Sequence, residues 1–369
     1  MLKKTIIISN PSFLKKHDEQ LVIDQGEQKS SIPIEDIGLL LLDHWQVTIT
    51  QGCISAILAN DGIIISCDKS HHPDGIMLPV SGNAVHAETL RAQVECSVPF
   101  RKQLWQQTIK TKILNQAALL EQLSAPLSQS GRGVGGEGRT GVGGEALRHF
   151  AVKVRSGDPN NLEGRAAAYY WKNLFSADLK FKRERFGEPP NNLLNYGYAL
   201  LRASVARGVV CAGLHPALGI HHRNRYNAFC LADDLMEPYR PFVDAVVRNI
   251  VMPLVPLAPA GREVGLPAEG GGEGQFGNQK SEIENLELTP DLKKQLLVVL
   301  GNDVLMEGER KPLQLAVGKT CASLAQCLRK EANKILYPEF CPSSDVPSFF
   351  KEGGGEVETD ADPDKVGTA

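Results

Sequence analysis

The sequence predicts an α+β fold, in which a small β-rich domain at residues 1–80 precedes a mainly α-helical domain at residues 81–350. Short apolar runs between polar or glycine-containing turns fill the first eighty residues, which is the spacing of strands. After Gly82 the apolar residues recur at intervals of three and four, which is typical of helices. The 369 residues are enough for two domains, each with its own core.

The β-rich domain is expected to hold one short helix, at residues 53–59, among its strands. The apolar runs that predict the strands cover residues 5–9, 21–24, 37–42, 47–50 and 62–67. The first of these runs is too short for a signal peptide, and no small-residue cleavage site follows it. No stretch approaches the roughly 20 apolar residues that span a bilayer. We therefore expect a cytoplasmic protein without a membrane segment.

The helical domain is expected to open with helices at residues 86–95 and 100–123, where the apolar spacing is three and four. Another helix is expected just after Asp158, because aspartate caps helices and Pro159 suits a first helical turn. Glu163 then falls early in this helix.

Later helices are delimited by glycine and proline. One is expected at residues 192–207 and should end at Gly208, since glycine is common just beyond a helix. Another should begin at Thr289, with Pro290 in its first turn. A last helix, at residues 322–335, is expected to close the domain.

Three tracts differ in composition from the predicted domains. Residues 126–146 contain a glycine-rich segment and a near copy of it, residues 258–278 are similar, and residues 351–369 form an acidic tail. Because such tracts lack large apolar side chains, they cannot offset the entropy lost on ordering. We expect flexible insertions at the first two and a disordered tail.

The distribution of charge suggests a polyanionic partner. The net charge is −3, but residues 161–250 hold twelve Lys or Arg against eight Asp or Glu. A local positive potential of this kind attracts phosphates. Eight cysteines are scattered without a Cys-x-x-Cys pair, so structural zinc is not expected and reduced thiols are.

A histidine pair and an acidic cluster form the candidate site. His221 and His222 precede Asp234 and Glu237, and Glu237 lies fifteen residues after His222. On a helical wheel the two acids are about 60° apart and point away from the apolar stripe, onto an exposed or cleft-lining face. An imidazole and two carboxylates suit a hard divalent cation. The competing interpretations are a hydrogen-bonded histidine and a solvated helix face.

The apolar stripe of the acidic helix comprises Leu235, Tyr239, Phe242, Val246 and Ile250.

Four ordered motifs resemble those of a known family. They read Asn-Leu-Glu-Gly-Arg-Ala-Ala at 161–167, Leu-Asn-Tyr-Gly-Tyr at 194–198, Leu-Gly-Ile-His-His at 218–222 and Leu-Ala-Asp-Asp-Leu-Met-Glu-Pro-Tyr-Arg-Pro at 231–241. Their order and spacing are similar to the CRISPR-associated integrase–endonuclease family, the larger of the two universal spacer-acquisition proteins. The double histidine and the Ala-Asp-Asp-Leu wording resemble its type II branch.

The resemblance implies a metal centre and a reaction. It maps the metal-binding and catalytic residues onto Glu163, His222 and Glu237, with Asp234 and His221 as auxiliary groups. It implies Mg²⁺ or Mn²⁺ as cofactor, and a 3′-hydroxyl attack on a phosphodiester that inserts spacer DNA into a CRISPR array as part of antiviral immunity. Imidazole ligation favours Mn²⁺.

Arginines and lysines around this site are candidates for DNA contact, because forked donors bind phosphates and aromatic rings stack on bases. They are Arg165, Lys180, Lys182, Arg183, Arg185, Arg223, Arg225 and Arg240.

The resemblance also implies partners. These are double-stranded DNA (the incoming fragment and the CRISPR repeat), a second copy of the chain in a homodimer, and a small companion protein that bridges two dimers. The RNA-guided effector nuclease of a type II system is a further candidate partner. Two alternative functions stay open: a metal-dependent nuclease for branched or damaged DNA, and a non-catalytic DNA-binding scaffold.

Overall fold

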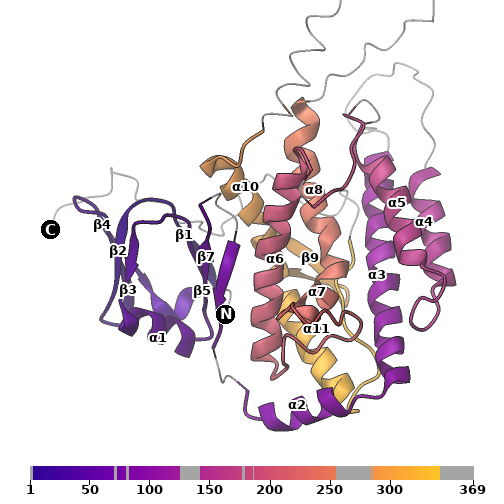
Figure 1. Cartoon of the computed structure of the whole chain (residues 1–369), viewed down its shortest axis with the longest axis horizontal. Helices are drawn as coiled ribbons and strands as arrows, with labels where there is room; N and C mark the ends of the chain where they lie inside the picture. The colour runs from indigo at the N-terminus through magenta and orange to yellow at the C-terminus, as the bar shows by residue number, and fades with distance from the viewer. Residues whose placement is uncertain are drawn as a thin grey trace, which may run out of the picture.

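The computed structural model of the chain describes residues 3–69, 73–79, 83–124, 142–176, 179–185, 187–254, 283 and 286–340. These residues form a β-rich N-terminal region and a helical region that lie side by side (Figure 1). The predicted α+β fold class is confirmed. No helix in these ranges is both long enough and apolar enough to cross a membrane.

Two four-stranded sheets build the β-rich region. The first has the order β1-β5-β7-β8, and the second has the order β4-β3-β2-β6. β1, β5 and β7 run parallel, so that Ile6 pairs with Leu40 and Leu40 with Ile64. The elements are β1 (Lys4–Ile8), β2 (Ser12–His17), β3 (Gln20–Asp24), β4 (Lys29–Pro33), η1 (Ile34–Asp36), β5 (Ile37–Leu42), β6 (Val47–Ile49), α1 (Gln51–Ala59), β7 (Ile63–Cys67) and β8 (Pro73–Met77).

The first sheet is buried on both faces, which explains its continuous apolar strands. Ile6, Leu40 and Ile64 point into a core shared with the second sheet and α1. Leu39 and Leu41 point the opposite way, into the large core of the helical region. The two regions therefore share one sheet as their common wall.

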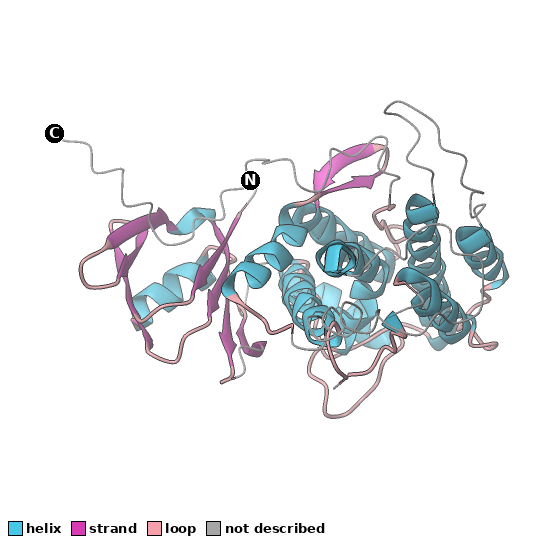
Figure 2. Ribbon diagram, turned by 90° about the horizontal axis from the view of Figure 1, so that it is seen from above, coloured by secondary structure: helices cyan, strands magenta, loops and turns pink. Residues whose placement is uncertain are grey.

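The helical region is arranged around two long helices, α3 and α6. Figure 2 shows the helices of this region from above. α4 and α5 pack on one side of α3, and α7, η3 and α8 lie between α3 and α6 (Figure 1). The elements are α2 (His86–Glu95), α3 (Val98–Ser124), α4 (Val142–Lys153), α5 (Leu162–Leu174), α6 (Asn191–Cys211), α7 (Cys230–Met236), η3 (Glu237–Tyr239), α8 (Arg240–Val251), η4 (Met252–Leu254), α10 (Pro290–Gly301), β9 (Asp303–Met306), β10 (Glu309–Pro312) and α11 (Leu313–Leu328).

Several predicted boundaries are wrong. α6 continues through Gly208 to Cys211, because that glycine serves close packing: a Cβ there would lie 3.0 Å from Cys321 Sγ on α11. The last helix is α11, which ends at Leu328, so the helix predicted at 322–335 is misplaced. The β9–β10 hairpin before it was not predicted.

Two further predictions need correction. Residues 142–146 were assigned to a flexible insertion but begin α4, whose Leu147 and Ala151 are buried in the main core. The rest of that tract, residues 258–278 and the tail lie outside the described residues. α5 begins at Leu162 rather than at Pro159, because Asn161 takes the N-cap position and accepts a hydrogen bond from Gly164 N.

A buried ion pair joins the β-rich and helical regions. Lys293 Nζ on α10 lies 2.6 Å from Asp43 Oδ2, just after β5, and both side chains are almost fully buried. Breaking one partner of such a pair leaves an uncompensated charge in the interior. This contact therefore helps to fix the shared sheet against the helices.

Candidate metal centre

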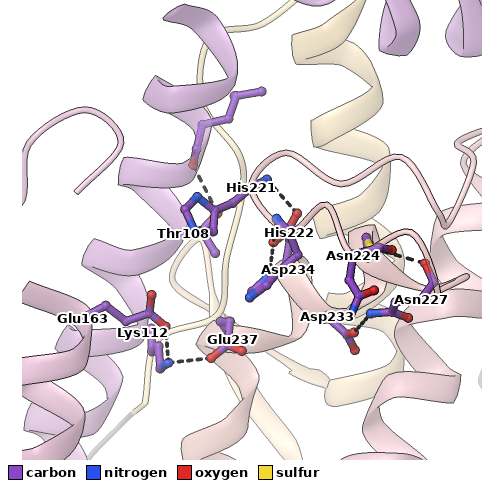
Figure 3. A network of polar contacts seen from close by, with 12 residues as sticks. Thr108, Lys112, Glu163, His221, His222, Asn224, Asn227, Asp233, Asp234 and Glu237 are labelled. Carbon is purple, nitrogen blue, oxygen red and sulfur yellow. Dashed lines mark hydrogen bonds and ion pairs between the residues drawn. The ribbon is translucent and has the colours of Figure 1, made fainter. Parts of the chain in front are cut away.

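Three separate segments bring the predicted acids and histidine together beside α3. Glu163 comes from the first turn of α5, His222 from the loop before α7, and Glu237 from the start of η3. Figure 3 shows Glu163, Lys112 and Glu237 in a row, with Asp234 and His222 next to Glu237. The three predicted ligands thus lie in one part of the structure.

Glu163 is held by the entry to α5. Both carboxylate oxygens of Asp158 accept backbone hydrogen bonds, one from Leu162 N and one from Glu163 N. An acid in the first helical turn is also favoured by the helix dipole. The Glu163 carboxylate is about a quarter exposed and turns toward α3.

Glu237 sits where α7 gives way to η3. Pro238 follows it and lacks a backbone N–H, which interrupts the α-helical hydrogen bonding at this point. The Pro238 carbonyl accepts a hydrogen bond of 2.8 Å from Asn115 Nδ2 on α3. The acidic side chain is 7% exposed, so of the two expected positions, an exposed or a cleft-lining face, the exposed one is wrong for Glu237.

Two cations hold the Glu237 carboxylate. Arg240 Nε lies 2.9 Å from Oε1, and Lys112 Nζ lies 2.6 Å from Oε2. Burial alone would raise the pKa of Glu237, but the charges of Arg240 and Lys112 outweigh it and lower that pKa to about 2. Glu237 is therefore ionised across the physiological pH range.

Lys112 bridges the two acids. Its Nζ also lies 2.7 Å from Glu163 Oε1, and its side chain is 10% exposed. Burial would lower the pKa of Lys112, but the charges of Glu237 and Glu163 raise it above its ordinary value. The sequence interpretation did not include this residue.

Asp234 positions His222. Asp234 is fully buried, which corrects the predicted exposed or cleft-lining face, and its Oδ1 lies 2.6 Å from His222 Nδ1. Its oxygens also accept the backbone N–H groups of His221 and His222. The hydrogen bond to Asp234 raises the pKa of His222. When the neutral ring donates from Nδ1, its Nε2 carries the free lone pair.

Gly219 is needed for this loop to approach Asp234. A Cβ at Gly219 would lie 2.5 Å from the His222 carbonyl oxygen and 2.7 Å from Asp234 Oδ2. His221 turns away and stacks on Trp105 of α3, with ring centroids 4.2 Å apart and an interplanar angle of 3°. Burial lowers the pKa of His221.

The arrangement offers ligand atoms of the kind that bind a divalent cation, but these atoms do not form a complete coordination site. Two carboxylates and an imidazole suit Mg²⁺ or Mn²⁺, and Glu237 Oε2 is buried without a hydrogen bond of good geometry. Across the described ranges, no three His, Cys, Asp or Glu side chains already converge on one point. The Lys112 ammonium lies between the two acids instead.

The predicted DNA-contacting residues fall into two groups. Arg165, Lys182 and Arg225 are exposed, although Lys182 pairs with Glu184 and Arg225 lies over the Tyr226 ring. Their exposure makes these side chains accessible to a phosphate.

Lys180, Arg185 and Arg223 are exposed as well.

Arg183 and Arg240 are used inside the protein. Arg183 donates to the side-chain oxygens of Asn191 and Asn195. Arg240 holds Glu237 and lies 4.5 Å over the Tyr198 ring. The geometry therefore gives both arginines an internal partner rather than an open face.

A cavity of about 450 Å³ opens beside His222. Its lining includes Arg101, Arg223 and Arg225, and no acidic side chain. Within the described chain, Arg101 Nε is buried without a hydrogen-bond partner. Arg101 stands on α3 and was not predicted, because a lone arginine in a helix carries no sequence signal of its own.

A second buried cluster supports the site from behind. Asp244 on α8 accepts hydrogen bonds from Tyr170 on α5 and Tyr198 on α6. Burial raises the pKa of Asp244 to about 6. This cluster ties the helix that carries Glu163 to the helix that follows Glu237.

The fold and site define a two-domain α+β protein whose helical domain gathers two acids and a histidine around one lysine. The family model of CRISPR associated protein Cas1 matches residues 5–253. A CRISPR-associated endonuclease Cas1 of Neisseria meningitidis serogroup C is 31% identical over 93% of this chain and 98% of that protein. The chain belongs to the Cas1 family, as its motifs predicted.

Other relatives agree with this assignment. A Cas1 endonuclease of Pyrobaculum aerophilum is 26% identical over 66% of this chain and 81% of its own length. Among solved structures, a casposase bound to its integration product has a TM-score of 0.66 at 18% identity, over 96% of each chain. A Cas1 protein from Thermotoga maritima has a TM-score of 0.62 at 16% identity, over 88% of this chain and 96% of its own. These structural likenesses show a shared fold.

Proposed function

We propose that the chain is a divalent-metal-dependent DNA endonuclease and integrase, which inserts new spacer DNA into a CRISPR array by 3′-hydroxyl attack on a phosphodiester. One observation carries the proposal: Glu163, His222 and Glu237, far apart in sequence, lie in one part of the helical domain with Asp234 behind the histidine. Family membership and the relatives named as Cas1 endonucleases support it.

The chain's own residues divide the work. Glu163, His222 and Glu237 would hold Mg²⁺ or Mn²⁺, which when bound neutralises charge on the reacting phosphate and orients its oxygens. Asp234 would keep the ring proton of His222 on Nδ1, which leaves the Nε2 lone pair available to the metal ion. Arg240 keeps Glu237 ionised and in place. No protein nucleophile is required, since the attacking group belongs to the DNA.

The DNA would reach the centre through the arginine-lined cavity beside His222. Arg101, Arg223 and Arg225 offer forked donors there and no acidic group opposes them. Phosphate contacts of this type position a strand without reading its sequence. The exposed Arg165, Lys180, Lys182 and Arg185 would extend the contact along the backbone.

We also propose the partners that the family resemblance implies. They are double-stranded DNA, a second copy of the chain, and a small companion protein bridging two such dimers. A solved Cas6-RT-Cas1–Cas2 complex has a TM-score of 0.64 at 17% identity, over 94% of this chain and 37% of that chain, which supports the same fold in such an assembly. The identity to the Neisseria protein supports the type II branch, and with it the RNA-guided effector nuclease as a partner. The proposed place of action is the cytoplasm, where the array DNA lies.

A strand-transfer assay tests the function. The purified chain is mixed with the companion protein, a short duplex with free 3′-hydroxyls and a plasmid that carries the repeat, with Mg²⁺, Mn²⁺ or EDTA. Glu163→Gln, His222→Ala and Glu237→Gln should each abolish joining, and so should EDTA. Asp233→Asn, next to Asp234 but paired with Arg202, is the matched control and should keep joining.

The outcomes separate the three candidate functions. Joining that depends on the metal and on the three residues supports the integrase. Metal-dependent hydrolysis of branched or damaged DNA without joining would indicate a repair-type nuclease instead. Salt-sensitive DNA binding with no turnover in either metal would indicate a scaffold.

A further inference from the structure

Lys112 stands where the two acidic ligands of the candidate centre meet. Its Nζ lies 2.7 Å from Glu163 Oε1 and 2.6 Å from Glu237 Oε2 (Figure 3). The three residues come from α3, α5 and η3. In this structure the ammonium is therefore the cation that both carboxylates share.

The charges of the cluster do not accommodate this ammonium together with a divalent cation. Glu163, Glu237 and Asp234 carry three negative charges, and Arg240 pairs with Glu237 through a 2.9 Å contact. Three carboxylates, Arg240 and one divalent cation balance to zero. Adding the Lys112 ammonium leaves a surplus positive charge among buried groups, which is costly.

The atoms also compete. A Mg²⁺ ion approaches carboxylate oxygens to about 2.1 Å along their lone pairs. Lys112 Nζ donates a hydrogen bond to Glu163 Oε1 and lies in ion-pair contact with Glu237 Oε2, so it stands between the two oxygens. An ion bound between these oxygens must take at least one contact from the ammonium.

The displacement requires a movement of the lysine side chain and not of the α3 backbone. The backbone of α3 is fixed beside it, because Asn115 Nδ2 donates to the Pro238 and Pro338 carbonyls and Trp105 stacks on His221. The Lys112 side chain has a flexible stem of four carbons. The Glu163 side chain is more exposed than the Glu237 side chain, so the ammonium can move toward solvent on the Glu163 side.

We propose that the Lys112 ammonium is a built-in occupant of the metal position, which holds Glu163 and Glu237 together in the metal-free protein and is displaced from Glu237 when a divalent cation binds. This inference rests on the proposed metal-dependent function. Lys112 is a positioning residue: it stops the two acids from repelling one another before loading, and it lowers the affinity for the ion by competing with it.

The test compares two buried lysines. Lys112→Met removes the charge and keeps an unbranched side chain that is one atom shorter. Lys293→Met is the matched control, because Lys293 is equally buried and pairs with Asp43 at 2.6 Å on the far side of the helical region. The Mn²⁺ dissociation constant is measured from the electron paramagnetic resonance signal of free Mn²⁺, and Tm is measured in EDTA and in saturating Mn²⁺.

Both variants should melt below the wild-type protein in EDTA. Lys112→Met should bind Mn²⁺ at least about tenfold more tightly than wild type, because the competitor is gone. It should also gain more Tm from Mn²⁺ than wild type does. Lys293→Met should bind Mn²⁺ within about twofold of wild type, since distant sites act independently.

The contrary results are distinct. If Lys112→Met binds Mn²⁺ as tightly as wild type, or more weakly, the proposed displacement is refuted. The metal-dependent function is not affected by either result. No Mn²⁺ binding by any of the three proteins would overturn the metal centre itself.

If Lys112→Met does not fold, a crystal structure of the wild-type protein with Mn²⁺ decides. Nζ should then lie beyond about 4 Å from Glu237 Oε2, outside ion-pair range. Retention of both lysine contacts around a bound ion would refute the proposal.

Discussion

Asp234→Asn isolates the contribution of the buried carboxylate behind His222. Asp234 Oδ2 accepts His221 N at 2.9 Å, and Oδ1 accepts His222 N at 3.1 Å and meets the ring Nδ1 at 2.6 Å. An asparagine has one oxygen, so its amide nitrogen must face at least one backbone N–H. A buried donor left without an acceptor costs about 1–3 kcal/mol. We expect the free energy of unfolding to fall by about 2 kcal/mol near neutral pH.

The loss should depend on pH in a defined direction. Asp234 raises the folded pKa of His222 above its ordinary value, so this pair adds stability that is complete below the unfolded pKa of 6.5 and disappears as pH rises through the folded pKa. The neutral amide of the variant cannot stabilise the charged imidazole in this way. The difference between wild type and variant should therefore be larger near pH 6 than near pH 9, by urea unfolding in EDTA.

The same substitution should damage the candidate centre. The amide would donate to Nδ1, which moves the ring proton to Nε2 and removes the outward lone pair. Strand transfer should fall by at least about tenfold. Asp233→Asn is the control, because Asp233 pairs with Arg202 and Asn227 instead. An Asp234→Asn loss of equal size at both pH values would refute the assigned pairing.

Two further substitutions test the backbone around the site. Gly219→Ala places a Cβ 2.5 Å from the His222 carbonyl oxygen, so unfolding free energy should fall by about 1–3 kcal/mol and strand transfer by at least about tenfold. The control is Gly318→Ala on α11, where a Cβ meets nothing within 4 Å, and it should retain both stability and strand transfer. A Gly219→Ala variant without any loss would contradict the close approach of Gly219 to the His222 carbonyl. Asn115→Ala removes the hydrogen bonds with Pro238 O, Pro338 O and Phe340 N. The free energy of unfolding, measured in urea, should therefore fall by about 3 kcal/mol or more. A fall below about 1 kcal/mol would contradict the importance of these hydrogen bonds.

The sequence predicted strands well where both faces are buried and poorly at the edges. β5 was placed at its observed bounds, and β7 within one residue, since both are central and continuously apolar. β2, β4 and β8 were missed because they are edge or half-exposed strands with few apolar residues. The apolar pattern of a sequence reflects which residues are buried, and edge strands bury few residues.

The site was predicted in its residues but not in its surroundings. The histidine pair and Glu237 were singled out from their spacing, while Glu163 and the choice of His222 came from the family resemblance. The helical wheel assumed one continuous helix, whereas Asp234 lies on α7 and Glu237 on η3, and it could not show that both acids are buried. Whether the three residues bind a metal stays a prediction.

Lys112 was not predicted as a site residue, because a single lysine in a long helix is typical of a solvated surface. A usable signal was nevertheless present. Leu104, Thr108, Lys112, Asn115 and Leu119 follow one another at intervals of four, four, three and four, which is one face of a helix. Three polar residues on a face that otherwise reads as buried indicate groups with dedicated partners, since unpaired polar groups are rarely buried.

The role of α3 follows from these contacts. It supplies none of the predicted ligands, yet Trp105 stacks on His221, Lys112 binds both acids and Asn115 fixes the carbonyl next to Glu237. All three contacts lie on one face, so a shift of α3 by one residue would turn that face by about 100° and break them together. The register of α3 thus sets the distance between Glu163 on α5 and Glu237 on η3. Substitutions on this face of α3 should therefore disturb the candidate centre, although α3 contributes none of its predicted ligands.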